Sequence, residues 1–292
     1  MKILISGASG LFGSALMRIA KINGYQTFAF SRSSIQLSLK ASNQNNLDSY
    51  FDDADFFIHA AANTDVEACE ADPYTCYRDN LILTELLVGA AKKRNIPVVF
   101  ISSTGVYGKH KNTPWFEYDE PNPTTCHHHS KLLAEKVVLG ANYSNLVVRT
   151  GWLFGGGQNA KNFVVQRIKE AQSSTSGIIF SNQEQYGCPT FVDDLAQRVL
   201  DLMSLEANGI FNVVNTGAAS RLEYVQEIVR LLGLGITIVP TNANNFKRIA
   251  PVSNNEMAVN WRSECFGLPS MRSWTDALTE YLASNCIKEI LI

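Results

Sequence analysis

Residues 2–18 read KILISGASGLFGSALMR, and this stretch decides the fold class. A short apolar run, 2–6, leads directly into a G-x-x-G-x-x-G loop at 7–13, and a helical pattern follows. Glycines at these spacings let the backbone turn tightly and approach a pyrophosphate, while the next helix supplies N–H donors and a positive dipole end. The order predicts a dinucleotide-binding βαβ unit. The loop residues expected to contact the cofactor are Gly7, Ser9, Gly10, Leu11, Phe12 and Gly13.

The same alternation continues beyond the loop. Further apolar runs suited to strands lie at 26–30, 55–59, 97–102 and 145–149, and helical periodicity occupies 11–22, 73–94 and 124–140. Strands that alternate with helices form parallel sheets through right-handed crossovers. We therefore predict an α/β fold with a Rossmann-like, doubly wound parallel sheet.

The alternation weakens after the three glycines at 155–157. Shorter helices are expected near 162–171, 192–204, 221–232 and 273–283. We assign residues 1–150 to an NADP(H)-binding Rossmann domain with a soft boundary. Residues 151–292 are assigned to a smaller substrate-binding α/β lobe that is interleaved with the first domain.

Composition narrows the range of partners. The chain has 292 residues, 46% of them hydrophobic, and 25 basic against 27 acidic residues give a net charge of -2. This balance provides no strong field for nucleic acid or for a membrane surface, and no apolar run is long enough for a transmembrane helix. Six scattered cysteines fit a reducing compartment. We expect a cytoplasmic protein, monomeric or homodimeric, without nucleic-acid or membrane partners.

The end of the second predicted strand bears on cofactor choice. NAD-selective folds place an acidic residue here to accept from the ribose hydroxyls, but this chain has Ser31 and Arg32. A guanidinium with a neighbouring hydroxyl can hold a 2′-phosphate. The sequence therefore favours NADP(H), with NAD(H) as the alternative.

Hydroxyl groups and a lysine point to the reaction site. Strand 97–102 ends at Ser103 and Thr104, at the edge where open α/β sheets bind ligands. A later helix carries His127 and Lys131 four residues apart, hence on one face. Neighbouring histidines at 127–129 point about 100° apart on a helix and cannot converge on one ion, so no metal site is predicted.

From these residues the chain resembles the extended short-chain dehydrogenase/reductase superfamily, and within it the dTDP-4-dehydrorhamnose reductases most closely. The resemblance covers nearly the whole chain. Besides the glycine loop, it rests on HAAANT at 59–64, YRDN at 77–80, ISSTGVYG at 101–108, PNP at 121–123, SKL at 130–132, RTGWLFG at 149–155, KNFV at 161–164, QYGCPT at 185–190 and SWTDAL at 273–278.

The resemblance implies roles for the matching positions. Ser103 would polarise the substrate carbonyl, and Lys131 would hold the nicotinamide ribose and lower the pKa of the proton donor. Further cofactor contacts would come from Ala60, Ala61, Ala62 and Asn80. Substrate contacts would come from Thr64, Ser103, Thr104, Trp152, Asn162 and Gln185. The implied reaction is hydride transfer from NADPH to the C4 ketone of a 4-keto-6-deoxy nucleotide sugar, as in dTDP-rhamnose and polysaccharide biosynthesis.

The departure from the family pattern lies at the proton donor. The family carries a tyrosine four residues before the lysine, and this chain has His127. Imidazole is a common general acid–base group, although a lysine one turn away favours its neutral form. Three hypotheses follow: His127 donates the proton, Tyr107 or a water replaces the phenol, or the fold and cofactor site survive in a regulatory protein without catalysis. An NAD-dependent sugar-nucleotide epimerase is a further alternative.

Overall fold

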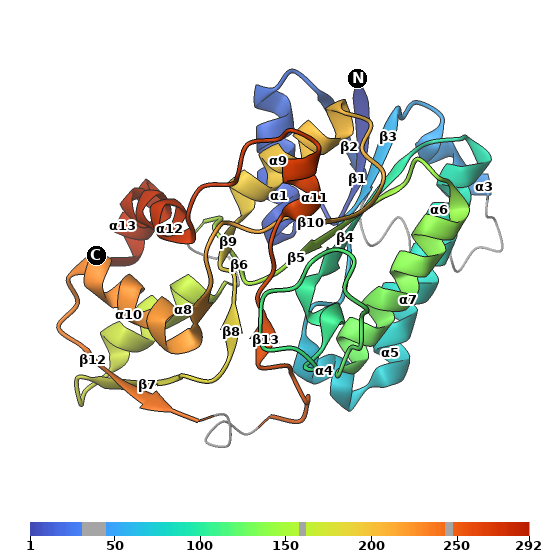
Figure 1. Ribbon diagram of the computed structural model, residues 1–292. Coiled ribbons are helices and arrows are strands. Elements are labelled where there is room, and N and C mark those ends of the chain that lie inside the picture. The colour runs from blue at the N-terminus through green and yellow to red at the C-terminus, as the bar shows by residue number, and fades with distance from the viewer. Residues whose placement is uncertain (31–44, 158–161, 243–247, 292) are drawn as a thin grey trace.

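The computed structural model describes residues 1–30, 45–157, 162–242 and 248–291 (Figure 1). A six-stranded sheet forms its centre, in the order β10 (Gly209–Asn212), β5 (Leu146–Thr150), β4 (Val98–Ser103), β3 (Phe56–His59), β1 (Lys2–Ser6) and β2 (Gln26–Phe30). Every neighbouring pair is parallel. The predicted doubly wound parallel sheet is confirmed, and each of the five predicted strands lies in it.

The inner strands β1, β3, β4 and β5 are buried on both faces because their apolar side chains alternate between two cores. Ile3 and Ile5 of β1 join one core, and Leu4 between them joins the other. The first core lies under α1 (Leu11–Ile22) and α9 (Val192–Ser204), which pack side by side. The second lies under α6 (Leu83–Lys93) and α7 (Cys126–Ala141) (Figure 1). Helices on both faces leave the carboxyl edge of the sheet as the open side.

Local signals explain where the helices begin and break. Thr125 caps α7 through its hydroxyl, so this helix begins at Cys126. The predicted helix 73–94 is divided into α5 (Pro73–Tyr77), a π-helical turn η2 (Arg78–Ile82) and α6. Shorter elements in this half are α3 (Asn45–Asp48), η1 (Ser49–Phe51), α4 (Val66–Ala71) and η3 (Thr104–Tyr107). Single π turns inside α-helices are frequent at functional sites.

The remaining elements form a smaller lobe below the sheet in Figure 1. They are β6 (Leu153–Phe154), α8 (Phe163–Ser173), β7 (Ile178–Asn182), β8 (Tyr186–Gly187), β9 (Thr190–Phe191), β11 (Ala219–Ser220), α10 (Arg221–Leu232), β12 (Thr237–Thr241), β13 (Asn255–Glu256), α12 (Trp274–Ala283) and α13 (Asn285–Leu291). The short helix α11 (Trp261–Cys265) instead packs against β10 of the main sheet (Figure 1). An aromatic core holds the lobe together and includes Phe154, Tyr224 and Tyr281.

The two halves of the sequence share the main sheet. Both β10 and α9 come from beyond residue 150, yet β10 pairs with β5 and α9 packs against α1. Residues 1–150 therefore do not complete the sheet by themselves. None of the helices in the described ranges has the length and apolar character needed to span a bilayer.

Candidate active site

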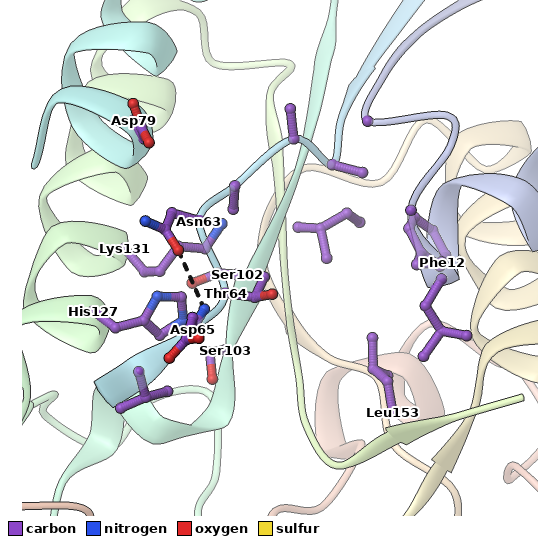
Figure 2. Close-up of a pocket in the computed structure, with 18 of the residues that line it drawn as sticks. Phe12, Asn63, Thr64, Asp65, Asp79, Ser102, Ser103, His127, Lys131 and Leu153 are labelled. Atoms are coloured by element: carbon purple, nitrogen blue, oxygen red, sulfur yellow. Dashed lines mark hydrogen bonds between the residues drawn. The ribbon is translucent and has the colours of Figure 1, made fainter. Parts of the chain in front are cut away.

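A cavity of about 1490 Å³ opens at the carboxyl edge of the sheet. Strand order reverses between β1 and β3, which is the switch point where doubly wound folds bind ligands. The glycine loop and α1 lie on one side, and α7 with the end of β4 lies on the other (Figure 2). Since small-molecule pockets usually measure about 300–1,000 Å³, this cavity has room for two ligands side by side.

The glycine loop forms a close backbone cradle at the start of α1. Gly7 has φ 74°, and the Gly10 N–H donates to its carbonyl oxygen over 2.9 Å. A Cβ on Gly7 would lie 2.7 Å from the Ala61 backbone nitrogen, and one on Gly13 would collide with the Gly7 carbonyl. Gly10 precedes α1 without a capping side chain, so the first N–H groups of the helix are left for an anion.

Most of the residues expected to bind the cofactor lie around this cavity. The lining includes Gly7, Ser9, Gly10, Leu11, Phe12, Gly13, Ala60, Ala61, Ala62 and Lys131. Asn80 does not line it, because its side chain is buried just behind the wall. Ser31 and Arg32 lie outside the described residues, so selection of a 2′-phosphate by Arg32 stays a prediction.

The side of the cavity opposite the glycine loop carries the residues expected to react. Ser103 ends β4, and His127 and Lys131 project from successive turns of α7 toward it (Figure 2). All three residues line the cavity. The fold thus brings a hydroxyl, an imidazole and an amine to one cavity. The hydroxyl residue Ser103 precedes the two residues of α7 by 24 or more positions in the sequence.

Lys131 is held in a desolvated position. Its side chain is 5% exposed, and Nζ lies 4.1 Å from the centre of the Phe100 ring. Burial lowers the pKa of Lys131 to about 7, and the nearby Glu135 carboxylate opposes this shift. Glu135 is fixed by Arg149, which donates over 2.7 and 3.0 Å, and by the Ser102 hydroxyl over 2.5 Å. Near neutral pH, Lys131 can therefore both hold and release a proton.

His127 is a buried, neutral imidazole. Burial lowers its pKa to about 3, and the neighbouring His128 and Lys131 act in the same direction. Nδ1 of His127 lies 3.4 Å from the Asn80 side-chain nitrogen. The Asn80 amide is itself oriented, because its oxygen accepts the Asn63 backbone N–H over 2.7 Å. Asn80 sits in the π turn η2, so this irregular turn places an amide directly behind the imidazole.

The position of Tyr107 argues against its replacing the family tyrosine, and replacement by a water stays open. Its side chain is fully buried, outside the cavity lining, and its ring stacks on Trp115 with 5.2 Å between centroids. The hydroxyl donates to Asn212 over 2.8 Å. Burial also raises the pKa of Tyr107 to about 12. The turn η3 carries this side chain away from the carboxyl edge of β4.

The residues expected to bind substrate divide into two groups. Thr64, Trp152 and Gln185 line the cavity with Ser103, whereas Thr104 and Asn162 do not. Thr104 begins η3 and is buried against the backbone of Gly151. Asn162 caps α8: its oxygen accepts the Val165 N–H over 3.0 Å, and its nitrogen donates to the Gly155 carbonyl over 2.8 Å. Both side chains therefore have structural contacts outside the cavity lining, and their contact with substrate stays a prediction.

The charged or titratable residues of the cavity wall that the sequence did not identify include His128, Arg221, Arg248 and Glu256. Three of them come from the smaller lobe, and no local motif distinguishes them from surface charges. Ser220 and Glu223 form a capping box that begins α10, and this signal locates the helix without indicating that Arg221 faces a cavity. Across the described ranges, no group of three or more His, Cys, Asp or Glu side chains is arranged to hold a metal ion.

Comparisons with known proteins agree with this geometry. A family model described as the RmlD substrate binding domain matches residues 1–286. The spore coat polysaccharide biosynthesis protein SpsK of Bacillus subtilis is 28% identical over 281 residues, 96% of each chain. A dTDP-4-dehydrorhamnose reductase of Mycobacterium tuberculosis is 28% identical over 289 residues, 97% of this chain and 93% of its own. The crystal structure of a dTDP-4-dehydrorhamnose reductase from Clostridium acetobutylicum superposes with a TM-score of 0.89 at 28% identity, covering all of both chains.

Proposed function

The chain belongs to the RmlD substrate binding domain family, and on that premise we propose that it is an NADPH-dependent reductase of the C4 ketone of a 4-keto-6-deoxy nucleotide sugar. One observation carries the proposal. Ser103, His127 and Lys131 line the cavity that the glycine loop closes from the other side. The relatives named as dTDP-4-dehydrorhamnose reductases support the same reaction.

The residues at the switch point fit a dinucleotide. Gly7 and Gly13 keep open a space that a Cβ would fill, so a pyrophosphate can approach the backbone and the start of α1. Lys131 lies deep enough to bind the hydroxyls of a ribose. When bound, NADPH supplies the hydride that reduces the ketone carbon. Arg32 is proposed to select its 2′-phosphate, with NAD(H) as the alternative cofactor.

The reacting residues divide the work on the ketone oxygen. The Ser103 hydroxyl donates a hydrogen bond that polarises the carbonyl. His127, neutral near pH 7, gives its ring proton to the alkoxide as it forms and becomes an imidazolate, which the protonated Lys131 one helical turn away stabilises and reprotonates. Lys131, whose pKa lies at about 7, thus returns a proton to the imidazolate. The product carries a C4 hydroxyl, and the proton ultimately comes from solvent.

We place this activity in the cytoplasm, as the free cysteines and the NADPH requirement suggest. The nucleotide sugar is the principal partner, and the chain works as a monomer or homodimer. Substrates of this class serve polysaccharide assembly, which agrees with the name of SpsK, a spore coat polysaccharide biosynthesis protein.

The decisive test is NADPH oxidation by the purified protein with a dTDP-4-keto-6-deoxy sugar. We expect turnover in the wild type and at least a 100-fold lower rate in Lys131→Met, because a positioned proton-transfer group contributes about 10²–10⁴-fold. Lys136→Met, an exposed position on the same helix, is the control and should keep the wild-type rate.

The variants His127→Tyr and His127→Phe distinguish a reductase from a regulatory protein with an impaired site. A wild type that turns over, with His127→Phe inactive, supports histidine as the proton donor. NADPH binding without turnover in the wild type, and turnover in His127→Tyr, would instead mean a regulatory protein with an impaired site. Nicotinamide cofactor retained through purification, with C4 epimerisation and no net NADPH oxidation, would favour the epimerase.

A further inference from the structure

Two charged side chains of the smaller lobe face the cavity without an ion partner. Arg221 and Glu256 both line it. Within the described part of the chain, neither forms a salt bridge within 4 Å. Each of the two charges is influenced by the other without a direct ion pair, so both keep hydrogen-bonding capacity for a ligand in the cavity.

Trp152 holds both charges in place. Its indole N–H donates to Glu256 Oε2 over 3.2 Å, and the Arg221 guanidinium carbon lies 3.5 Å from the centre of the indole ring. Trp152 adopts a left-handed backbone with φ 49°. A Cβ on Gly187 would collide with the indole, so the ring is packed directly on a glycine. The indole is a rigid platform with the guanidinium on its face and the carboxylate at its N–H edge.

Arg221 keeps most of its donors available. It is the first residue of α10, where its backbone N–H donates to the Gln185 carbonyl over 3.0 Å. Its Nε lies 3.5 Å from Gln185 Oε1, the only side-chain hydrogen bond of this guanidinium among the described residues. Stacking covers the faces of the group and leaves the in-plane N–H donors for a bidentate anion.

Glu256 lines the same cavity as the reacting residues and the two arginines. It is 8% exposed, and only its Oε2 has a hydrogen-bond partner among the described side chains. Its carboxylate opposes the lowering of the His128 pKa by burial, and the His128 ring centroid lies 5.1 Å from that of His127. The same carboxylate favours the charged form of Arg221, whereas the charge of Arg248 opposes it. The cavity wall therefore carries imidazole rings, a carboxylate and two guanidinium groups.

A nucleotide sugar carries groups that these side chains can bind. The C4 ketone lies across the pyranose ring from C1, which carries the diphosphate. With the ketone at His127, ring hydroxyls reach the carboxylate and the phosphates reach the guanidinium groups. In a 6-deoxy sugar nucleotide, the diphosphate is the only anionic group. Resting on the proposed function, we propose that Arg221 binds the sugar-linked phosphate and that Glu256 accepts hydrogen bonds from the hydroxyls of the sugar.

Equilibrium titration with thymidine, dTDP and dTDP-glucose tests the two roles separately, because these probes add the phosphates and then the sugar. We expect Arg221→Gln to weaken dTDP about 10- to 100-fold, as loss of a charged hydrogen bond does, and to leave thymidine unchanged. Glu256→Gln, which keeps an acceptor for Trp152, should weaken dTDP-glucose and leave dTDP unchanged. Arg230→Gln, exposed on the same helix, is the control.

The outcomes distinguish this inference from the proposed function. Unchanged dTDP affinity in Arg221→Gln, or equal losses for thymidine and dTDP, would overturn the phosphate role. Equal losses of dTDP and dTDP-glucose in Glu256→Gln would overturn the sugar role. A wild type that binds NADPH but neither dTDP nor UDP would instead contradict the proposed function. Arg221→Lys should recover part of the dTDP affinity, because the charge remains and the bidentate geometry does not.

Discussion

Replacing Lys131 with methionine should make the protein more stable while removing its activity. Methionine keeps an apolar side chain beside Phe100. It removes the amino group, whose charged form is destabilised by burial. Lowering the pKa of a lysine from 10.5 to about 7 corresponds to roughly 4–5 kcal/mol at pH 7, at about 1.36 kcal/mol per pH unit. The mutant also loses the favourable contact between the ammonium and the Phe100 ring, which reduces this gain in stability by up to about 2 kcal/mol. We expect a net gain of about 2–3 kcal/mol.

The pH dependence identifies the cause. Between pH 10.5 and pH 7 the unfolded chain binds a proton at this lysine and the folded chain does not. The penalty is therefore absent above pH 10.5, grows as the pH falls, and is constant below about 7. The stability difference between Lys131→Met and the wild type should narrow by about 2 kcal/mol from pH 7 to pH 9.

Urea unfolding of both proteins at pH 7 and pH 9 measures this difference. Lys136→Met, exposed on the same helix, should change the unfolding free energy by less than about 0.5 kcal/mol at either pH. A Lys131→Met protein less stable than the wild type at pH 7, or a difference equal at both pH values, would refute the desolvation argument. In that case Lys131 would be stabilised by its surroundings and could not serve as a proton reservoir near neutrality.

Three further predictions follow from the packing. Gly13→Ala should weaken NADPH binding at least about 10-fold, because its Cβ collides with the preceding loop. The control Gly140→Ala, with open space around the added methyl, should leave the NADPH affinity measured by titration unchanged. Equal NADPH affinities of Gly13→Ala and the wild type would contradict the role of the glycine loop. Arg149→Met leaves Glu135 buried and unpaired and should cost about 3–5 kcal/mol in urea unfolding; a loss under about 1 kcal/mol would mean the pair is solvated. Burial lowers the pKa of His59 and His127 to about 3, whereas in the unfolded chain both titrate near about 6.5. The free energy of unfolding should therefore be highest above about pH 6.5 and fall as the pH falls toward 3. Equal free energies of unfolding at pH 7 and pH 5 would contradict this.

The sequence predicted the sheet and one side of the cavity because these depend on short-range order. Strand, glycine loop and helix follow one another within 2–18, and parallel strands bring their carboxyl ends to one edge. The positions predicted Ser103 at a strand end and His127 with Lys131 on one helix face, and the family resemblance implied that the three act together. Their shared placement around the cavity agrees with that expectation, while their roles stay predictions.

Only the tertiary structure decided the other side and the state of the reacting groups. Arg221 and Glu256 lie 35 residues apart on different elements, and they share a platform because Trp152 is packed between them. Asn162 was predicted to bind substrate, and in the structure its side chain caps α8. Residue types and local periodicity determine which elements form and which edge is open. Burial, and hence the charge on Lys131 and His127, depends on every chain segment packed around a side chain, and no local stretch of sequence contains that information.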